Sequence, residues 1–339
     1  MIVDADAHVI ESDATWDFLE PHERKYRPTA LTGAGDEKFW LVDGQLFSRE
    51  AGNLSLPNAV RQMADLKARA AIMDESSIAT QVLYPTLFLQ GMPSKRPEIQ
   101  IALARSYNRW LASVWQQNAR FRWTVIPPLL DMPAALQELD YGKSNGACGV
   151  FMRGIEGEWL LHDPYLEPLY RRAEQLDLPI CVHAGNGNND FKNVLFRKDL
   201  YFFGITPILA GFNAVASSGL QTRFKTLRFA FIEAGAQWVP YLVREAARRH
   251  EFIGTKGKVD DETKFLSQNR IWVTTRTNDD LPYVLRYAGN GSLVLGTDFG
   301  HEDPAAELGA FTRMRERKDI DPAQIDAIFA DNARRLYAI

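Results

Sequence analysis

The first ten residues place acidic and imidazole side chains at the end of an apolar run. Asp4, Asp6 and His8 alternate with small or apolar residues between Ile2 and Ile10. Because alternate side chains of a strand point to the same face, these three would share one side of a strand. A carboxylate and an imidazole two residues apart can hold a divalent cation. An ordinary first strand with a polar end is an equally good interpretation of this segment alone.

Polar side chains of the same kind follow several later apolar runs. They are His183, Glu233, Asp298 and His301, together with the arginines Arg153 and Arg276. Each has an ordinary structural interpretation. A histidine at a strand end is more often hydrogen-bonded than metal-bound, an acid often precedes a helix, and the arginines could pair with these acids. A functional interpretation therefore requires a fold that brings the group together.

Eight apolar, β-branched runs alternate with segments of helical periodicity. The predicted strands cover 2–8, 80–85, 121–127, 147–153, 179–183, 228–233, 270–275 and 292–297. The predicted helices cover 60–76, 98–118, 133–143, 164–176, 238–252, 281–287 and 304–317. This alternation is typical of an α/β fold with a parallel sheet covered on both faces. Eight strands, none followed by Gly-x-Gly-x-x-Gly, favour a (β/α)8 TIM barrel over an open doubly wound sheet.

Two stretches interrupt the alternation of predicted strands and helices. Because both can be insertions in a barrel, the whole chain, 1–339, is expected to form a single barrel domain. The first insertion, about 29–58, follows strand one and contains a predicted hairpin with an Asp43-Gly44 turn. The second, about 186–225, lies between strands five and six and includes an amphipathic segment near 207–217. Their aromatic side chains suit a subunit interface, so we expect a homo-oligomer (dimer or tetramer), with a hetero-oligomer as the alternative. These aromatic residues are Trp40, Phe47, Phe191, Phe202, Phe203 and Phe212.

The composition restricts the possible partners and the compartment. A net charge of -4 gives no basic surface for nucleic acid. No apolar run approaches the roughly 18 residues that cross a bilayer, so no membrane association is expected. Cys148 and Cys181 both lie inside apolar runs, which indicates buried thiols of a reducing compartment. With no basic-then-apolar segment at the N-terminus, we expect a cytoplasmic protein that acts on a small molecule.

In a barrel, the chemistry-bearing residues named above would gather at the C-terminal ends of the strands, where barrel enzymes bind their substrates. Three carboxylates facing one barrel mouth would repel one another strongly unless a cation or a proton lay between them. A divalent metal ion resolves that repulsion.

Motifs spread along the whole chain resemble those of one family, the amidohydrolase-2 (aminocarboxymuconate-semialdehyde decarboxylase-like) branch of the amidohydrolase superfamily. The matching segments are Asp4-Ala-Asp6-Ala-His8, Val182-His183-Ala-Gly185, Phe231-Ile232-Glu233-Ala-Gly235-Ala-Gln-Trp238, Gly296-Thr-Asp298-Phe-Gly-His301 and Asn332-Ala333-Arg334-Arg335-Leu336-Tyr337. They occur in the order expected of the family, whose members are metal-dependent barrels.

The resemblance implies a set of metal ligands. Asp6 and His8 match the strand-one pair, His183 matches the strand-five ligand, and Asp298 matches the strand-eight aspartate, which is both ligand and proton shuttle. Glu233 departs from the pattern, because many members have a histidine there. An oxygen-rich set favours Mn2+ or Fe2+ over Zn2+ and leaves room for one or two ions.

Two reactions fit such a site. In a hydrolase the cation would activate water, and Asp298 would take its proton; in a decarboxylase Asp298 would deliver a proton to carbon. His301 would be a second acid–base group, and Arg153 and Arg276 would bind the carboxylate of the substrate. A dinuclear Mn or Fe oxygenase and a non-catalytic partner subunit with a degenerate metal site are the alternatives.

Overall fold

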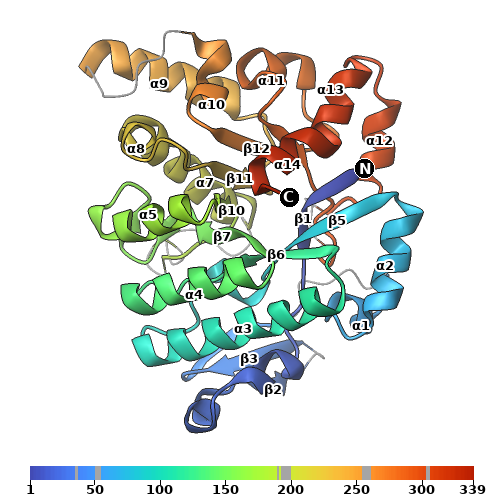
Figure 1. Ribbon diagram of the computed structural model, residues 1–339, viewed down its shortest axis with the longest axis vertical. Helices are drawn as coiled ribbons and strands as arrows, with labels where there is room; N and C mark the ends of the chain where they lie inside the picture. Colours follow the sequence, from blue (N-terminus) through green and yellow to red (C-terminus); the bar gives the residue numbers. More distant parts are fainter. Residues whose placement is uncertain (35–36, 50–54, 189–190, 192–199, 254–260, 303–305) are drawn as a thin grey trace.

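The computed structural model describes residues 1–34, 37–49, 55–188, 191, 200–253, 261–302 and 306–339. Eight parallel strands form one sheet in the order β1-β5-β6-β7-β10-β11-β12-β13, with helices outside it (Figure 1). The strands are β1 (Ile2–His8), β5 (Ile78–Tyr84), β6 (Phe121–Val125), β7 (Ala147–Arg153), β10 (Ile180–His183), β11 (Phe229–Ile232), β12 (Ile271–Thr275) and β13 (Leu293–Leu295).

The sheet closes into a barrel through backbone hydrogen bonds between β1 and the segment that follows β13. The amide of Asp298 donates to the carbonyl of Asp6 (2.9 Å), and the amide of His8 donates to the carbonyl of Phe299 (2.7 Å). The predicted (β/α)8 barrel is therefore confirmed. Every residue of β1 and β7 is buried, as expected for strands covered on both faces.

Helices occupy the predicted intervals with two differences, and the described residues contain four further short α-helices that were not predicted, at 220–223, 265–268, 322–326 and 332–337. The α-helices are α1 (Asn58–Arg61), α2 (Leu66–Glu75), α3 (Pro97–Gln117), α4 (Met132–Ser144), α5 (Glu167–Gln175), α7 (Leu200–Ser217), α8 (Leu220–Arg223), α9 (Val239–Ile253), α10 (Phe265–Gln268), α11 (Leu281–Ala288), α12 (Ala310–Glu316), α13 (Pro322–Asp326) and α14 (Asn332–Tyr337). Among the described residues, no helix is long and apolar enough to cross a bilayer.

The helix predicted over 60–76 is instead two helices, α1 and α2. Met63 adopts a left-handed backbone (φ 56°), which ends the first helix. Asp65 then caps the second by accepting a hydrogen bond from the amide of Ala68 (2.9 Å). The helix predicted over 304–317 begins at Ala310, and residues 304 and 305 lie outside the described part of the chain.

The first insertion forms a three-stranded antiparallel sheet of β2 (Thr29–Thr32), β3 (Lys38–Val42) and β4 (Gln45–Ser48). The predicted hairpin is confirmed, since Asp43 (φ 47°) and Gly44 (φ 77°) take the positive φ angles that a tight two-residue turn requires. The hydroxyl of Ser94, which precedes α3, donates to the carboxylate of Asp43 in this turn (2.6 Å). Trp40 of the sheet packs edge-to-face on Trp16, with ring centroids 5.9 Å apart.

The second insertion contains α7, of which the predicted amphipathic segment is the C-terminal part. Gly154, directly after β7, permits the close approach of this helix, because a Cβ on Gly154 would lie 1.7 Å from the carbonyl oxygen of Pro207. This contact packs α7 against the C-terminal end of β7. The expectation that Cys148 and Cys181 are buried free thiols is also confirmed.

Candidate metal centre

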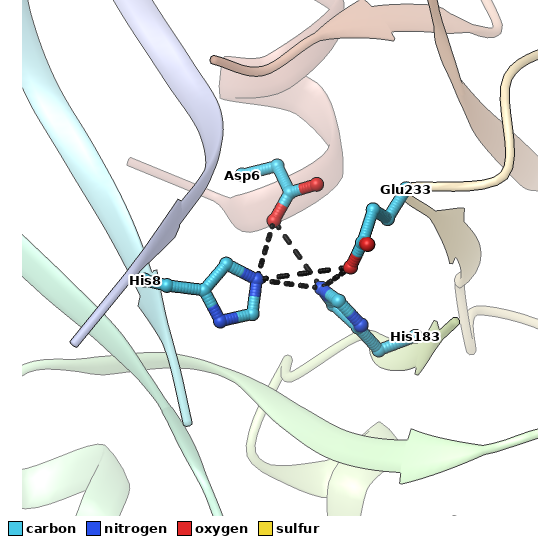
Figure 2. A group of neighbouring side chains, drawn as sticks. All are labelled: Asp6, His8, His183 and Glu233. Carbon is cyan, nitrogen blue, oxygen red and sulfur yellow. Dashed lines mark hydrogen bonds and ion pairs between the residues drawn. The ribbon is translucent and has the colours of Figure 1, made fainter. Parts of the chain in front are cut away.

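The C-terminal ends of three strands bring two carboxylates and two imidazoles to one point. Asp6 and His8 come from β1, His183 is the last residue of β10, and Glu233 directly follows β11. Figure 2 shows the four side chains pointing toward one another. His183 Nε2 lies 3.3 Å from Asp6 Oδ1 and 3.2 Å from Glu233 Oε2. One atom from each residue therefore falls within 4.8 Å of the others, close enough to share one ion.

The hydrogen bonds of the two imidazoles orient a lone pair of each toward this point. His8 Nδ1 lies 3.0 Å from the carbonyl oxygen of Pro85, and His183 Nδ1 lies 2.8 Å from that of Ala184. A carbonyl only accepts, so both Nδ1 atoms carry hydrogen and both neutral rings have a bare Nε2. The two Nε2 atoms are 3.1 Å apart. A divalent cation fits this donor set, because it replaces the repulsion between lone pairs and carboxylates with attraction.

Asp298 and His301 lie at the edge of this group, at the end of the last strand. Asp298 Oδ1 is 3.4 Å from His8 Nε2, and His301 Nδ1 is 2.9 Å from the same Asp298 oxygen. The ring of His301 stacks on that of His8 with centroids 3.8 Å apart. A second set of ligand atoms, from His8, Glu233, Asp298 and His301, thus lies within 4.8 Å. The structure brings together all six residues that were predicted as metal ligands or acid–base groups, Asp6, His8, His183, Glu233, Asp298 and His301.

Two of these residues have an unusual backbone. Glu233 (φ 69°) and Asp298 (φ 49°) are both in the left-handed region, which costs a non-glycine residue about 1–2 kcal/mol. Hydrogen bonds hold them there: the Glu233 amide donates to Thr274 Oγ1 (2.7 Å), and the Asp298 amide donates to the Asp6 carbonyl (2.9 Å). Such local strain is typical of functional sites, where it aims a side chain.

The charges of the cluster are set by burial and by the neighbouring groups. Burial holds the pKa of His8 well below its usual range, so this ring is neutral. Burial also opposes the charged form of His183, but Glu233 and Asp6 outweigh it and raise the pKa of His183. In Asp6, burial is again outweighed, here by His183, and the pKa falls. The two acids thus favour a positive charge at His183, whereas burial opposes one at His8.

Asp4 is not part of the cluster but joins β1 to β5 and to the segment that follows β13. Its carboxylate accepts hydrogen bonds from the amide (2.9 Å) and hydroxyl (2.7 Å) of Thr297 and from Gln81 Nε2 (3.1 Å). Gln81 in turn accepts from Arg69 Nε (2.8 Å), and Arg69 donates to the carbonyl of His8 (3.0 Å). Burial raises the pKa of Asp4 to about 6, although these hydrogen bonds lower it. The network positions the backbone on both sides of the ligands.

The two arginines predicted to bind substrate lie in different surroundings. Arg153 is only 3% exposed and forms an ion pair with Glu156, with Nε 3.1 Å from Oε2, and also donates to the carbonyl of Phe88. Arg276 follows β12 and donates from Nη2 to the carbonyl of Glu233 (3.1 Å). Arg276 therefore contacts a residue of the cluster, whereas the bonds of Arg153 hold the β7 terminus. Their binding of substrate stays a prediction.

Thr86 and Glu11 contact the site but were not among the predicted residues. Thr86 Oγ1 lies 2.9 Å from His301 Nε2. The buried carboxylate of Glu11 accepts from the amides of Thr86 (3.1 Å) and Leu87 (2.9 Å). Burial raises the pKa of Glu11 to about 7. In the sequence, an acid three residues after His8 only weakly indicates that Glu11 belongs to the site. An isolated threonine such as Thr86 gives no indication of a role there.

Known structures share this fold along the chain. An amidohydrolase from Mycobacterium avium subsp. paratuberculosis K-10 is 20% identical, with a TM-score of 0.79, covering 100% of this chain and 98% of its own. The 2,6-dihydroxybenzoate decarboxylase from Rhizobium is 18% identical with a TM-score of 0.66, and the match covers 99% of this chain and 98% of the decarboxylase. The 5-carboxyvanillate decarboxylase from Novosphingobium aromaticivorans is 15% identical with a TM-score of 0.66, and the match covers 80% of this chain and 81% of the decarboxylase. That structure contains bound manganese and 3-methoxy-4-hydroxy-5-nitrobenzoic acid.

The sequence itself matches a family along nearly its full length. The model of the family described as amidohydrolase matches residues 3–339, which include every residue of the cluster. The chain is therefore an enzyme that belongs to the amidohydrolase family.

Proposed function

We propose that this enzyme is a metal-dependent decarboxylase of a small aromatic carboxylic acid. The observation that carries the proposal is the adjacency of two groups: a metal-binding set around His8 and His183, and an acid–base pair, Asp298 and His301, 2.9 Å apart. Two structures with the same fold are decarboxylases of aromatic acids, and one of them holds manganese. The oxygen-rich donor set of this chain also favours manganese over zinc.

The residues divide into those that hold the cation and those that move a proton. Asp6, His8, His183 and Glu233 would hold the cation, with Asp298 as a further ligand. A bound divalent cation would orient and polarise the carboxylate of the substrate and an adjacent oxygen. Arg276, beside Glu233, would add a positive charge for the same anionic substrate.

Asp298 would supply the proton that replaces carbon dioxide. It would deliver the proton to the ring carbon that bears the carboxylate, the electrons of the breaking C–C bond would remain with that carbon, and carbon dioxide would leave. The side chain of Asp298 is only 2% exposed, so few water molecules compete for this proton. His301, hydrogen-bonded to Asp298, would share the proton before transfer.

Hydrolysis of a C–N or C–O bond is the second candidate, and the family description favours it. The same ligands would then serve, with Asp298 accepting a proton from water instead of donating one to carbon. A dinuclear oxygenase would use both overlapping ligand sets, which share His8 and Glu233.

The test combines elemental analysis with product analysis. The purified enzyme, supplied with Mn2+, is incubated in D2O with a panel of hydroxybenzoic acids, and carbon dioxide and the aromatic product are measured. We expect about one ion per chain, carbon dioxide release, and one deuterium on the carbon that lost the carboxylate. Turnover of amides or esters by an enzyme that releases no carbon dioxide would support the hydrolase instead, and two iron or manganese ions per chain would support the oxygenase.

A further inference from the structure

The two residues that follow β5 each contact one imidazole of the site. The carbonyl of Pro85 accepts a hydrogen bond from Nδ1 of His8 (3.0 Å). The hydroxyl oxygen of the next residue, Thr86, lies 2.9 Å from Nε2 of His301. Pro85 therefore contacts a residue of the metal-binding set, and Thr86 contacts a residue of the acid–base pair.

The position of one hydrogen follows from the partners of Thr86. Its hydroxyl has a single hydrogen, and the carbonyl oxygen of Val9, 2.8 Å away, can only accept. The Thr86 hydroxyl therefore donates to Val9, and its oxygen must accept from His301. His301 then carries its hydrogen on Nε2, and its Nδ1 faces Asp298 Oδ1 at 2.9 Å.

Glu11 fixes Thr86 in this position. Its two carboxylate oxygens accept separately from the amides of Thr86 (3.1 Å) and Leu87 (2.9 Å), and Glu11 is only 1% exposed. Both amides are thereby anchored to a residue three positions after His8. These bonds hold the backbone of Thr86, and the branched Cβ of threonine restricts the rotation of its side chain.

From these contacts we propose that Thr86 is a positioning residue that fixes the tautomer of His301, so that Nδ1 shares a proton with Asp298. Without the hydroxyl, Nε2 loses its acceptor, and the ring is free to place its single hydrogen on Nδ1 or to rotate. The role in turnover rests on the proposed function, because it requires Asp298 to move a proton. The tautomer itself does not depend on which reaction the enzyme catalyses.

The first test reads the tautomer directly. Zinc-loaded enzyme labelled with 15N-histidine is examined by long-range 1H–15N NMR, which separates Nδ1–H from Nε2–H rings, and a His301→Gln variant assigns the signals among the six histidines. We expect Nε2–H for His301 in the wild type and in Thr86→Ser, and a mixed or Nδ1–H ring in Thr86→Val. A Thr86→Val spectrum that matches the wild type would overturn the proposal, whatever the activity. If Thr86→Val does not fold, Thr86→Ala replaces it.

The second test separates positioning from stability. Thr86→Val should lower kcat about tenfold to hundredfold, part of the roughly 10²–10⁴-fold that a positioned acid–base group contributes, with KM within about twofold. Thr86→Ser should restore kcat to within about threefold. Thr124→Val is the matched control, because Thr124 is also buried and also donates to a carbonyl, that of Leu83. Equal loss of kcat in both valine variants would refute the positioning role. If the tautomer of His301 shifts in Thr86→Val but the wild-type enzyme decarboxylates no substrate, the proposed reaction is refuted and the positioning of His301 by Thr86 is not.

Discussion

Replacement of Gly296 by alanine tests whether the closure of the barrel holds the ligands in place. Gly296 lies between β13 and Asp298, against β1. A Cβ at this position would lie 2.2 Å from Asp6 Cβ and 2.8 Å from the backbone nitrogen of Asp6. Carbon atoms in contact are normally about 3.5–4.0 Å apart, so the two segments would have to separate by about 1.5 Å.

The cost of this separation can be estimated from the bonds it would break. The Asp6 carbonyl accepts from the amides of Thr297 (3.2 Å) and Asp298 (2.9 Å), and both distances would exceed hydrogen-bond range. Loss of buried hydrogen bonds costs about 1–3 kcal/mol each, and overpacking costs about 1–3 kcal/mol. Small shifts of the surrounding structure would offset part of this cost. We therefore expect Gly296→Ala to lower the free energy of unfolding by about 3–5 kcal/mol.

The assay is urea unfolding together with elemental analysis. Gly309→Ala is the matched control, because the nearest atom to its new Cβ would be Arg313 Nε at 4.0 Å and its φ of -88° suits any residue. We expect the control to stay within about 0.5 kcal/mol of the wild type with full metal content. Gly296→Ala should also bind less metal, since Asp6 is displaced. Unchanged stability and metal content in Gly296→Ala would refute the inferred closure.

Three further predictions concern individual carboxylates. Asp298→Asn should lower turnover at least about 10²-fold while metal remains bound, measured by kinetics and elemental analysis; full turnover with metal bound would exclude the proton transfer. Glu233→Gln should weaken metal binding by at least about tenfold in a chelator competition, because one negative ligand is lost; unchanged affinity would remove Glu233 from the ligand set. The raised pKa of Glu11 (about 7, against 4.5) means that the folded state binds more protons between about pH 4.5 and 7. Its contribution to the free energy of unfolding therefore falls as pH rises through that window and is constant above it, and Glu11→Gln should remove this part of the slope in urea unfolding. An identical slope in the variant would contradict the assignment.

The sequence predicts the barrel and the cluster well because both depend on local patterns. Apolar runs mark the strands, and a polar residue at the end of each run marks the mouth of the barrel, as with His183 and Glu233. What the sequence could not reveal are contacts between distant segments. Thr86 and His301 are 215 positions apart, and nothing near Thr86 distinguishes it from other threonines.

Local exceptions also escaped prediction. The left-handed residue Met63 divides a helix that looks continuous by periodicity. The strand β2 is mostly exposed, so it lacks the apolar signal by which strands are recognised. The direction of the Arg153 side chain depends on Glu156, which lies on a short hairpin strand, β8 (Ile155–Glu156), that the sequence pattern does not indicate.

The contact between Asp4 and Thr297 joins residues 293 positions apart. The distance along the chain between these segments determines when during folding a metal ion can bind. Closure of so long a loop is costly in entropy, so these contacts are expected to form late, after the neighbouring strands have paired. The ligands from β1 and from the end of β13 do not meet before that step. A cation would therefore bind only the closed barrel and would stabilise it by mass action. Without the cation this stabilisation is lost and more molecules would have an open seam, which exposes two unpaired strand edges that can pair with other chains.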